Sequence, residues 1–294
     1  MAVQRARRFA LKTRWETLLV GPFLISAGLL FGSQFVFLRQ SLHRDLRFGH
    51  QDPAWSVGNF VQILSDPYYL HALWLTTYIS LSVALICVVV GFPIAKVLAR
   101  QRSRWTSFLL STIVLTSFIT TVIQVFGLII IFRADGPVNE LLRAAGITRQ
   151  PLEMIGTPLG VILGLVYASF GFAVMLMYGV VLTIPPSLDE AASVHGASRA
   201  RVLVRVVLPL CAPGLIVAFL TIFNSCMGSF TSAALLGGGR VLTLPVLIQR
   251  TMLLDVKYGV AGALAALLLL FVVLLNVASV VVLRRFRTTR AVAL

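Results

Sequence analysis

The chain has 294 residues, of which 58% are hydrophobic and 12% are charged, and its mean hydropathy is +0.94. This composition excludes an ordinary soluble domain and predicts an integral membrane protein, with room for about six spans of roughly 20 residues each. The formal net charge of +15 would suggest nucleic acid as the partner of a soluble protein. In a membrane protein the sidedness of the charges explains it, so no nucleic-acid partner is expected.

The apolar runs predict an all-α integral membrane protein with six transmembrane helices. We place the spans at residues 17–38, 72–95, 108–132, 158–182, 213–236 and 258–283. The first run is too long for the core of a typical signal peptide, so we expect a retained helix that follows a basic tail of residues 1–16. Cys87, Cys211 and Cys226 lie in or beside apolar runs without metal or redox spacing, which indicates small core residues.

The lysines and arginines distinguish the two faces of the membrane. Of these 25 residues, 16 lie in the termini and in segments 96–107 and 183–212, against 9 in the segments on the other side. By the positive-inside rule, we expect a multi-pass inner-membrane protein with both termini cytoplasmic. Membrane lipids are expected partners, because segment 96–107 is basic enough to meet anionic headgroups and external segment 39–71 carries aromatic residues of the interfacial type.

The polar residues inside the predicted spans are neutral. Serine and threonine side chains there indicate hydrogen bonds between helices, worth about 0.6 kcal/mol each. Gln124 and Asn224 are costlier to hide, so we expect these two residues to line a polar translocation path. The sequence shows no nucleophile–base pair, metal-ligand cluster or phosphate-binding loop, and we therefore expect neither enzymatic activity nor a cofactor in this chain.

Two connections that contain glycine follow the third and fifth spans. Gly136-Pro137 is a turn signal, and the residues after it predict a short apolar helix at the outer surface, followed by Gly146. The run Leu235-Leu236-Gly237-Gly238-Gly239 places three glycines after the fifth span. They are expected to end the helix and to allow irregular backbone at the outer rim or along a cavity.

A polar segment that can form short helices, residues 183–212, separates the fourth and fifth spans. Pro185-Pro186 should stop the preceding helix, and Ser187 with Glu190 makes a capping box, so a helix of about two turns is expected from Leu188. Asp189 and Glu190 would complement the helix dipole in the first turn. Gly196 is expected to end this helix in the left-handed conformation.

The same segment predicts one face that another protein could approach. Leu188, Ala191, Ala192 and His195 follow helical spacing, and the two alanines would let a partner's backbone come close. A second helical run, capped by Ser198, is expected to end before Pro209. The alternative is an ordinary two-helix connection whose acidic residues merely cap.

The runs Glu190-Ala191-Ala192, Gly196-Ala197-Ser198 and Leu208-Pro209-Leu210 together resemble the EAA loop of ABC-importer permeases of the binding-protein-dependent type. Arg199 stands where that family often has proline, and Leu203 where an aromatic residue is common. In the family the loop is a coupling helix that docks in a groove of a cytoplasmic ATPase. The resemblance therefore implies ATPase-coupling roles for Ser187, Asp189, Glu190, Ala191, Ala192, His195, Gly196, Ala197, Ser198, Leu208 and Pro209.

The two glycine-containing connections are similar to the GxxN-x-x-L and LLGGG elements of the spermidine/putrescine branch, so the resemblance covers about residues 70–283. It implies the MetI-like ABC permease fold. The implied organisation is a tail of residues 1–16, a first helix and external loop at 17–71, a permease domain at 72–283 with its coupling loop at 183–212, and a cytoplasmic tail at 284–294.

The implied function is that of a permease subunit in an ATP-driven importer, with a polyamine or a similar small solute as substrate. The implied partners are two ATP-binding cassette ATPases, which would bind ATP and Mg, a second permease subunit, expected to be a paralogue, and a periplasmic or extracellular substrate-binding protein.

The residues leave two other classes of function open. An ion-coupled secondary transporter is disfavoured because the spans lack charged residues near their centres and because a dockable loop is present. A non-transporting membrane scaffold is the third class. Neither alternative needs an intermolecular charge at Glu190, and a substitution there would separate them from the importer.

Overall fold

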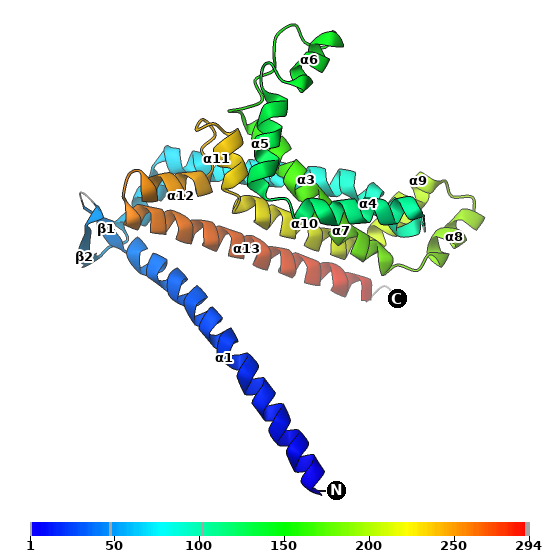
Figure 1. Ribbon diagram of the computed structural model, residues 1–294, viewed down its shortest axis with the longest axis horizontal. Helices are drawn as coiled ribbons and strands as arrows, with labels where there is room; N and C mark the ends of the chain where they lie inside the picture. The colour runs from blue at the N-terminus through cyan, green and yellow to red at the C-terminus, as the bar shows by residue number, and fades with distance from the viewer. Residues whose placement is uncertain (1, 47–48, 102, 292–294) are drawn as a thin grey trace. The chain divides into compact units, whose positions relative to one another are not determined.

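The computed structural model describes residues 2–46, 49–101 and 103–291, whose elements are labelled in Figure 1. These residues form two compact units, one from Asp66 towards the N-terminus together with Ile248–Leu267, the other from Pro67–Leu247 together with the chain from Leu268 onward. The first-unit elements that precede Asp66 are α1 (Ala2–Ser41), β1 (His43–Asp45), β2 (Gln51–Trp55) and α2 (Gly58–Ser65).

The elements from Pro67 onward are almost all helical. They are α3 (Pro67–Arg100), α4 (Arg104–Ser117), α5 (Thr121–Phe132), α6 (Pro137–Ala144), α7 (Pro158–Leu182), α8 (Ser187–Val194), α9 (Arg199–Val202), the π-helix η2 (Leu203–Val207), α10 (Leu208–Met227), α11 (Thr231–Leu236), α12 (Leu244–Leu253) and α13 (Tyr258–Ala291). The boundary between the two units falls inside α12 and again inside α13.

Six helical stretches of the described chain are long and apolar enough to cross a membrane, which confirms the predicted number. They are residues Val20–Ser41, Pro67–Arg100, Thr121–Ala144, Pro158–Leu182, Arg199–Met227 and Tyr258–Val281. The first, second, fourth and sixth predicted spans coincide with α1, α3, α7 and α13, although these helices extend beyond the predicted limits. The helix α1 starts at Ala2 and α13 reaches Ala291, so both continue into the predicted tails.

The core of the second unit is formed by α3, α7 and α10. The helix α3 packs against both others (Figure 1), and Val83, Met177 and Ile222 from the three helices are fully buried. A side chain on Gly91 would come within 2.6 Å of Met177, so this glycine permits the close approach of α3 to α7. All three cysteines are buried, as expected for small core residues.

The third predicted span, 108–132, is wrong as a single helix. The helix α4 ends at Ser117, and Thr120 has extended backbone before α5 begins. Near the end of α4 the hydroxyls of Thr112 and Thr116 each donate to the carbonyl four residues earlier. Such bonds compete with the backbone ladder and bend helices, which gives a physical reason for a break in a run without glycine or proline.

The fifth predicted span, 213–236, is wrong at both ends. The helix α10 begins at Leu208 and contains Pro209 within its first turn, where proline is tolerated because the missing N–H would have no partner in the helix. It ends at Met227, and residues 228–230 separate it from the short helix α11. The glycine run does end α11 as predicted, with Gly238 and Gly239 at φ of 52° and 74°.

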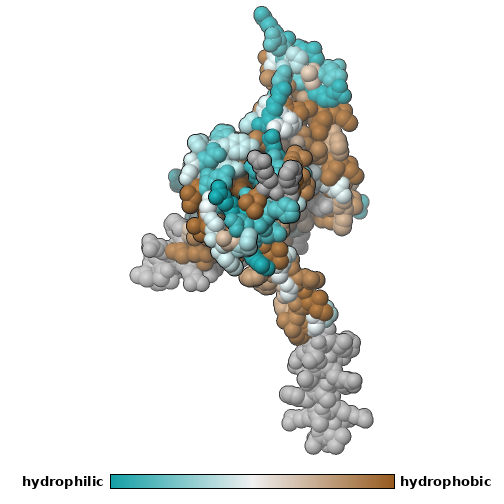
Figure 2. Space-filling model, turned by 90° about the vertical axis from the view of Figure 1, so that its left-hand side faces the viewer, coloured by the Kyte–Doolittle hydropathy of each residue, from teal (hydrophilic) through white to brown (hydrophobic). Residues whose placement is uncertain are grey.

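In the first unit, a short antiparallel hairpin of β1 and β2 was not predicted by the sequence analysis. The Asp45 carboxylate at the end of β1 accepts hydrogen bonds from the backbone N–H groups of Gly259 and Val260, each 2.8 Å long. It thereby caps the start of α13 from a distant part of the chain. Figure 2 faces the end of the molecule that bears the hairpin and shows mostly hydrophilic residues there, whereas the apolar part of α1 is hydrophobic.

Candidate functional site

The helix α8 lies in the predicted coupling segment, residues 183–208, but it does not begin as predicted. It starts at Ser187 with Pro186 as its N-cap, and no side chain caps it. The N–H groups of Asp189 and Glu190 both bond to the Pro186 carbonyl, because Pro186 already has helical backbone with φ −60° and ψ −27°. The capping box of Ser187 and Glu190 is therefore wrong, and Ser187 is the first residue of the helix.

The end of α8 confirms the prediction for Gly196. Its φ is +77°, and the Gly196 and Ala197 N–H groups bond to the carbonyls of Ser193 and Ala192 at 3.0 and 3.1 Å. This pattern is a Schellman motif, which satisfies the last carbonyls of the helix and favours glycine in the left-handed position. The local sequence thus ends α8 at a fixed residue.

The outward face of α8 carries most of the residues that the sequence analysis assigned to docking. Leu188, Glu190, Ala191 and His195 are exposed. Ala192 is only half-buried, and it packs with Ala197 against the hydrophobic core, so it belongs to the inner side of the segment. Within the described residues Glu190 makes no ion pair, which leaves its carboxylate available to a partner.

A continuous helical path leads from α8 to the fifth membrane helix. The Ser198 hydroxyl accepts from the Arg201 N–H and caps α9, as predicted. The predicted stop before Pro209 is wrong, since α9 continues through η2 into α10. Leu208 and Pro209 are the first two residues of α10, which places them where the coupling segment enters the membrane helix.

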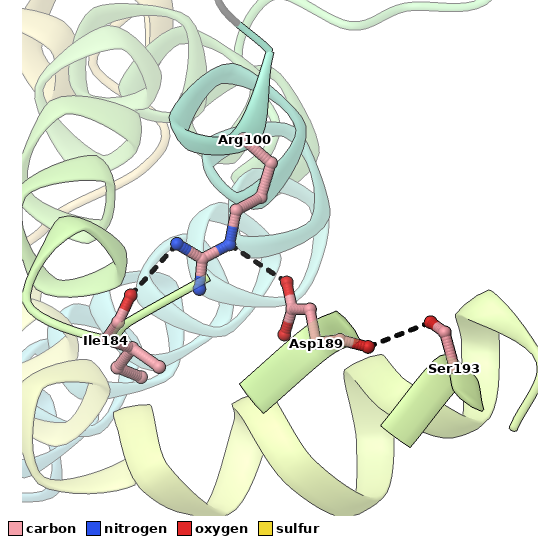
Figure 3. Close-up of polar contacts among 4 residues, drawn as sticks. All are labelled: Arg100, Ile184, Asp189 and Ser193. Atoms are coloured by element: carbon pink, nitrogen blue, oxygen red, sulfur yellow. Dashed lines mark hydrogen bonds and ion pairs between the residues drawn. The ribbon is translucent and has the colours of Figure 1, made fainter. Parts of the chain in front are cut away.

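Arg100 holds the start of this segment, an interaction that sequence reasoning missed (Figure 3). Its Nε lies 2.9 Å from Oδ2 of Asp189, and its Nη1 donates to the carbonyl of Ile184 at 2.9 Å. Arg100 is the last residue of α3, and Ile184 follows the end of α7. The guanidinium therefore joins the ends of two membrane helices to the first turn of α8.

Gln124 lies where the broken third span turns. Its side-chain amide donates to the carbonyls of Thr116 and Ile119 at 3.2 and 3.1 Å. These carbonyls belong to the end of α4 and the following turn, where the regular helix ladder stops. The structure thus gives Gln124 a local partner set that accounts for its polarity.

Asn224 pairs with a residue that the sequence analysis did not single out. The amides of Asn224 on α10 and Asn276 on α13 exchange two hydrogen bonds, of 2.9 and 3.2 Å, and both side chains are half-buried. Asn276 could have been noticed as the one asparagine in the apolar run 258–283.

The sequence and fold are similar to those of known transport proteins. A family model described as "Binding-protein-dependent transport system inner membrane component" matches residues 87–288. The chain is 29% identical over 249 residues to the spermidine/putrescine transport system permease protein PotB of Escherichia coli (strain K12), covering 82% of this chain and 90% of that protein. It is 30% identical over 200 residues to the protein of the same name from Haemophilus influenzae, covering 68% and 70%.

Two solved structures show the same fold at low sequence identity. One is a bacterial ABC transporter involved in the import of the acidic polysaccharide alginate, with a TM-score of 0.75, 19% identity, and coverage of 90% of this chain and 93% of that one. The other, an inward-facing MetNI methionine ABC transporter, has a TM-score of 0.57, 19% identity, and coverage of 74% and 94%. With a family model that matches more than half of its length, the chain belongs to the binding-protein-dependent transport system inner membrane components, the permease subunits of ABC importers.

Proposed function

We propose that the chain is a permease subunit of a polyamine importer and that residues 187–209 couple it to cytoplasmic ATPases. The proposed assembly contains two ATPases, which bind ATP and Mg and hydrolyse the ATP, a second permease that is a paralogue, and an external substrate-binding protein. The observation that carries the coupling role is α8 itself, a short capped helix whose Glu190, Ala191 and His195 are exposed.

The orientation proposed for this assembly puts both termini and α8 in the cytoplasm. The charge distribution supports it, since 16 of the 25 basic residues lie on that side. In this arrangement Glu190 is free to meet a cation of the ATPase. Closure of the ATPases around ATP would displace α8, and η2 and α10 would carry the displacement into the membrane. A π-helix inside a helix is frequent at functional sites, and η2 lies directly on this route.

Polyamine is proposed as the substrate because relatives named spermidine/putrescine permeases align with most of this chain. Asn224 is the residue we propose for the translocation path, since it is a half-buried amide in the middle of α10. For Gln124 the path remains a weaker proposal because its amide already has two backbone partners. Uptake of labelled spermidine and putrescine by proteoliposomes that contain the complete transporter and its binding protein tests the substrate; absence of uptake for both would contradict it.

Affinity purification from the native membrane, followed by mass spectrometry, tests the coupling role. The wild type should bring an ATPase with it, and Glu190→Gln should lose most of that ATPase while its membrane abundance stays unchanged. The matched control is Glu140→Gln, because Glu140 is exposed and is the fourth residue of α6 as Glu190 is of α8. Equal recovery of ATPase with both variants would contradict docking through Glu190.

A further inference from the structure

The ion pair of Arg100 and Asp189 has one bond formed and a second one unused. Among the described residues, Arg100 Nη2 and Asp189 Oδ1 are buried atoms without a hydrogen-bond partner. A guanidinium presents Nε and Nη2 on one edge as a fork that matches the two oxygens of a carboxylate. In Figure 3 the unused nitrogen and the unused oxygen lie on the same side of the bond that is formed. The fork is therefore half closed.

The pair lies where the coupling segment meets the membrane helices. Of the ion pairs among the described residues, it alone joins this segment to a membrane-spanning helix. The side chains are 17% and 20% exposed, so water screens them far less than a surface pair. Each charge is also placed favourably, with the cation at the end of α3 and the anion in the first turn of α8.

The surrounding packing leaves room for this contact to change. A groove of about 410 Å³ adjoins the pair, and apolar side chains of α3 and α9, including Val97 and Val202, line much of it. The helix α8 itself packs mainly on α9 and η2 rather than on the membrane helices. The position of α8 relative to α3 therefore depends on few contacts, and the charge pair is the strongest of them.

We propose that Arg100 and Asp189 act as positioning residues, forming a latch that keeps α8 in register with the ends of α3 and α7. When a partner displaces α8, the latch obliges the ends of α3 and α7 to follow, because Arg100 also holds the Ile184 carbonyl. The inference rests on the proposed coupling role of residues 187–209. It adds a second route of transmission, into the second and fourth membrane helices, to the route through α10.

A measurement on the permease itself tests the latch without depending on any ATPase. Spin labels at Ile94→Cys on α3 and Val194→Cys on α8 use exposed positions, while the three native cysteines are buried. The distance distribution between the labels should be narrow in the otherwise wild-type chain and should broaden with Arg100→Gln and equally with Asp189→Asn. The control, Arg104→Gln, removes an exposed cation near the same end of α3. Distributions that do not change with Arg100→Gln would overturn the proposal.

The second measurement is the number of substrate molecules transported per ATP hydrolysed by the reconstituted complex. Arg100→Gln and Asp189→Asn should each lower this ratio about tenfold, as coupling between sites typically changes by 5- to 150-fold. The ATPase should still co-purify because Glu190 is intact. The double variant should be no worse than either single variant, since both remove one interaction. Losses that multiply in the double variant would overturn the latch, whereas failure of Glu190→Gln to release the ATPase would count against the docking role alone.

Discussion

The loops at residues 133–157 and 183–207 show two ways of holding a polar segment. The first is tied by Asn139, which is fully buried. The Asn139 amide donates to the carbonyls of Arg133 and Leu152, and its oxygen accepts from the Leu152 N–H, at 2.8, 3.2 and 2.8 Å. The second is held by Arg100 and Asp189, each of which keeps one buried atom without a partner. A fully satisfied network fixes one structure, while a partly satisfied one can be rearranged at lower cost.

The largest effect is expected from removing the Asn139 amide. Asn139→Leu leaves three backbone groups without their partner, and each such group costs about 1–3 kcal/mol when buried. The variant should therefore be several kcal/mol less stable by this estimate, with a lower midpoint of thermal unfolding and reduced membrane abundance. Its exposed neighbour supplies the control, as Glu140→Gln should change neither quantity. Wild-type stability of Asn139→Leu would contradict the role of this residue.

Two glycines allow a matched comparison between the loops. Gly146 and Gly196 have φ of +70° and +77°, and neither would meet another atom within 4 Å if it carried a Cβ. Replacing either by alanine should cost about 1 kcal/mol, through backbone conformation alone. Gly196→Ala should also lower uptake about fivefold, because about 1 kcal/mol of misplacement falls on the coupling segment, whereas Gly146→Ala should not. Equal uptake by the two variants would remove the distinction.

The asparagine pair in the membrane should have a smaller effect on stability. A hydrogen bond between membrane helices is worth about 0.6 kcal/mol, so Asn224→Leu and Asn276→Leu should lower the unfolding midpoint slightly and equally. Uptake separates structure from transport. If Asn224 lines the path, Asn224→Leu should lower uptake more than Asn276→Leu does, and equal uptake would confine Asn224 to the pair.

The smallest effect is expected from Ser187, which does not cap α8. Ser187→Ala should leave hydrogen exchange of residues 188–195 unchanged. Ser198→Ala removes an observed cap and should cost about 1 kcal/mol, seen as faster exchange in α9. Faster exchange throughout α8 in Ser187→Ala would restore the capping box that the structure lacks.

Much of the fold follows from short-range patterns in the sequence. Apolar length alone predicts six membrane helices, and the ends at Gly196 and Ser198 depend on residues within four positions of each other. The break after Ser117 could not be predicted, because the run 108–132 contains no proline and its glycine, Gly127, lies inside α5. The start of α8 was missed because Pro186 takes helical backbone, a position that the pattern assigned to Ser187.

The candidate site was only partly predictable. The exposed residues of α8 are set by local helical spacing, and their sequence resemblance is confined to one segment. The Arg100–Asp189 pair joins residues 89 positions apart, and many arginines in the chain could have been the partner of Asp189. Only the packing of α3 against α7 and the turn after Leu182 bring these two side chains together.

The most direct test of the account is photo-crosslinking from α8 in living cells. A photoreactive amino acid at Ala191, on the exposed face, should form an adduct that mass spectrometry identifies as an ATP-binding cassette ATPase. The same group at Leu141 of α6, which is 70% exposed, should not capture that ATPase. Capture of the ATPase from position 191 alone is the result that we predict. Its capture from position 141 but not from position 191 would contradict both the orientation and the coupling role.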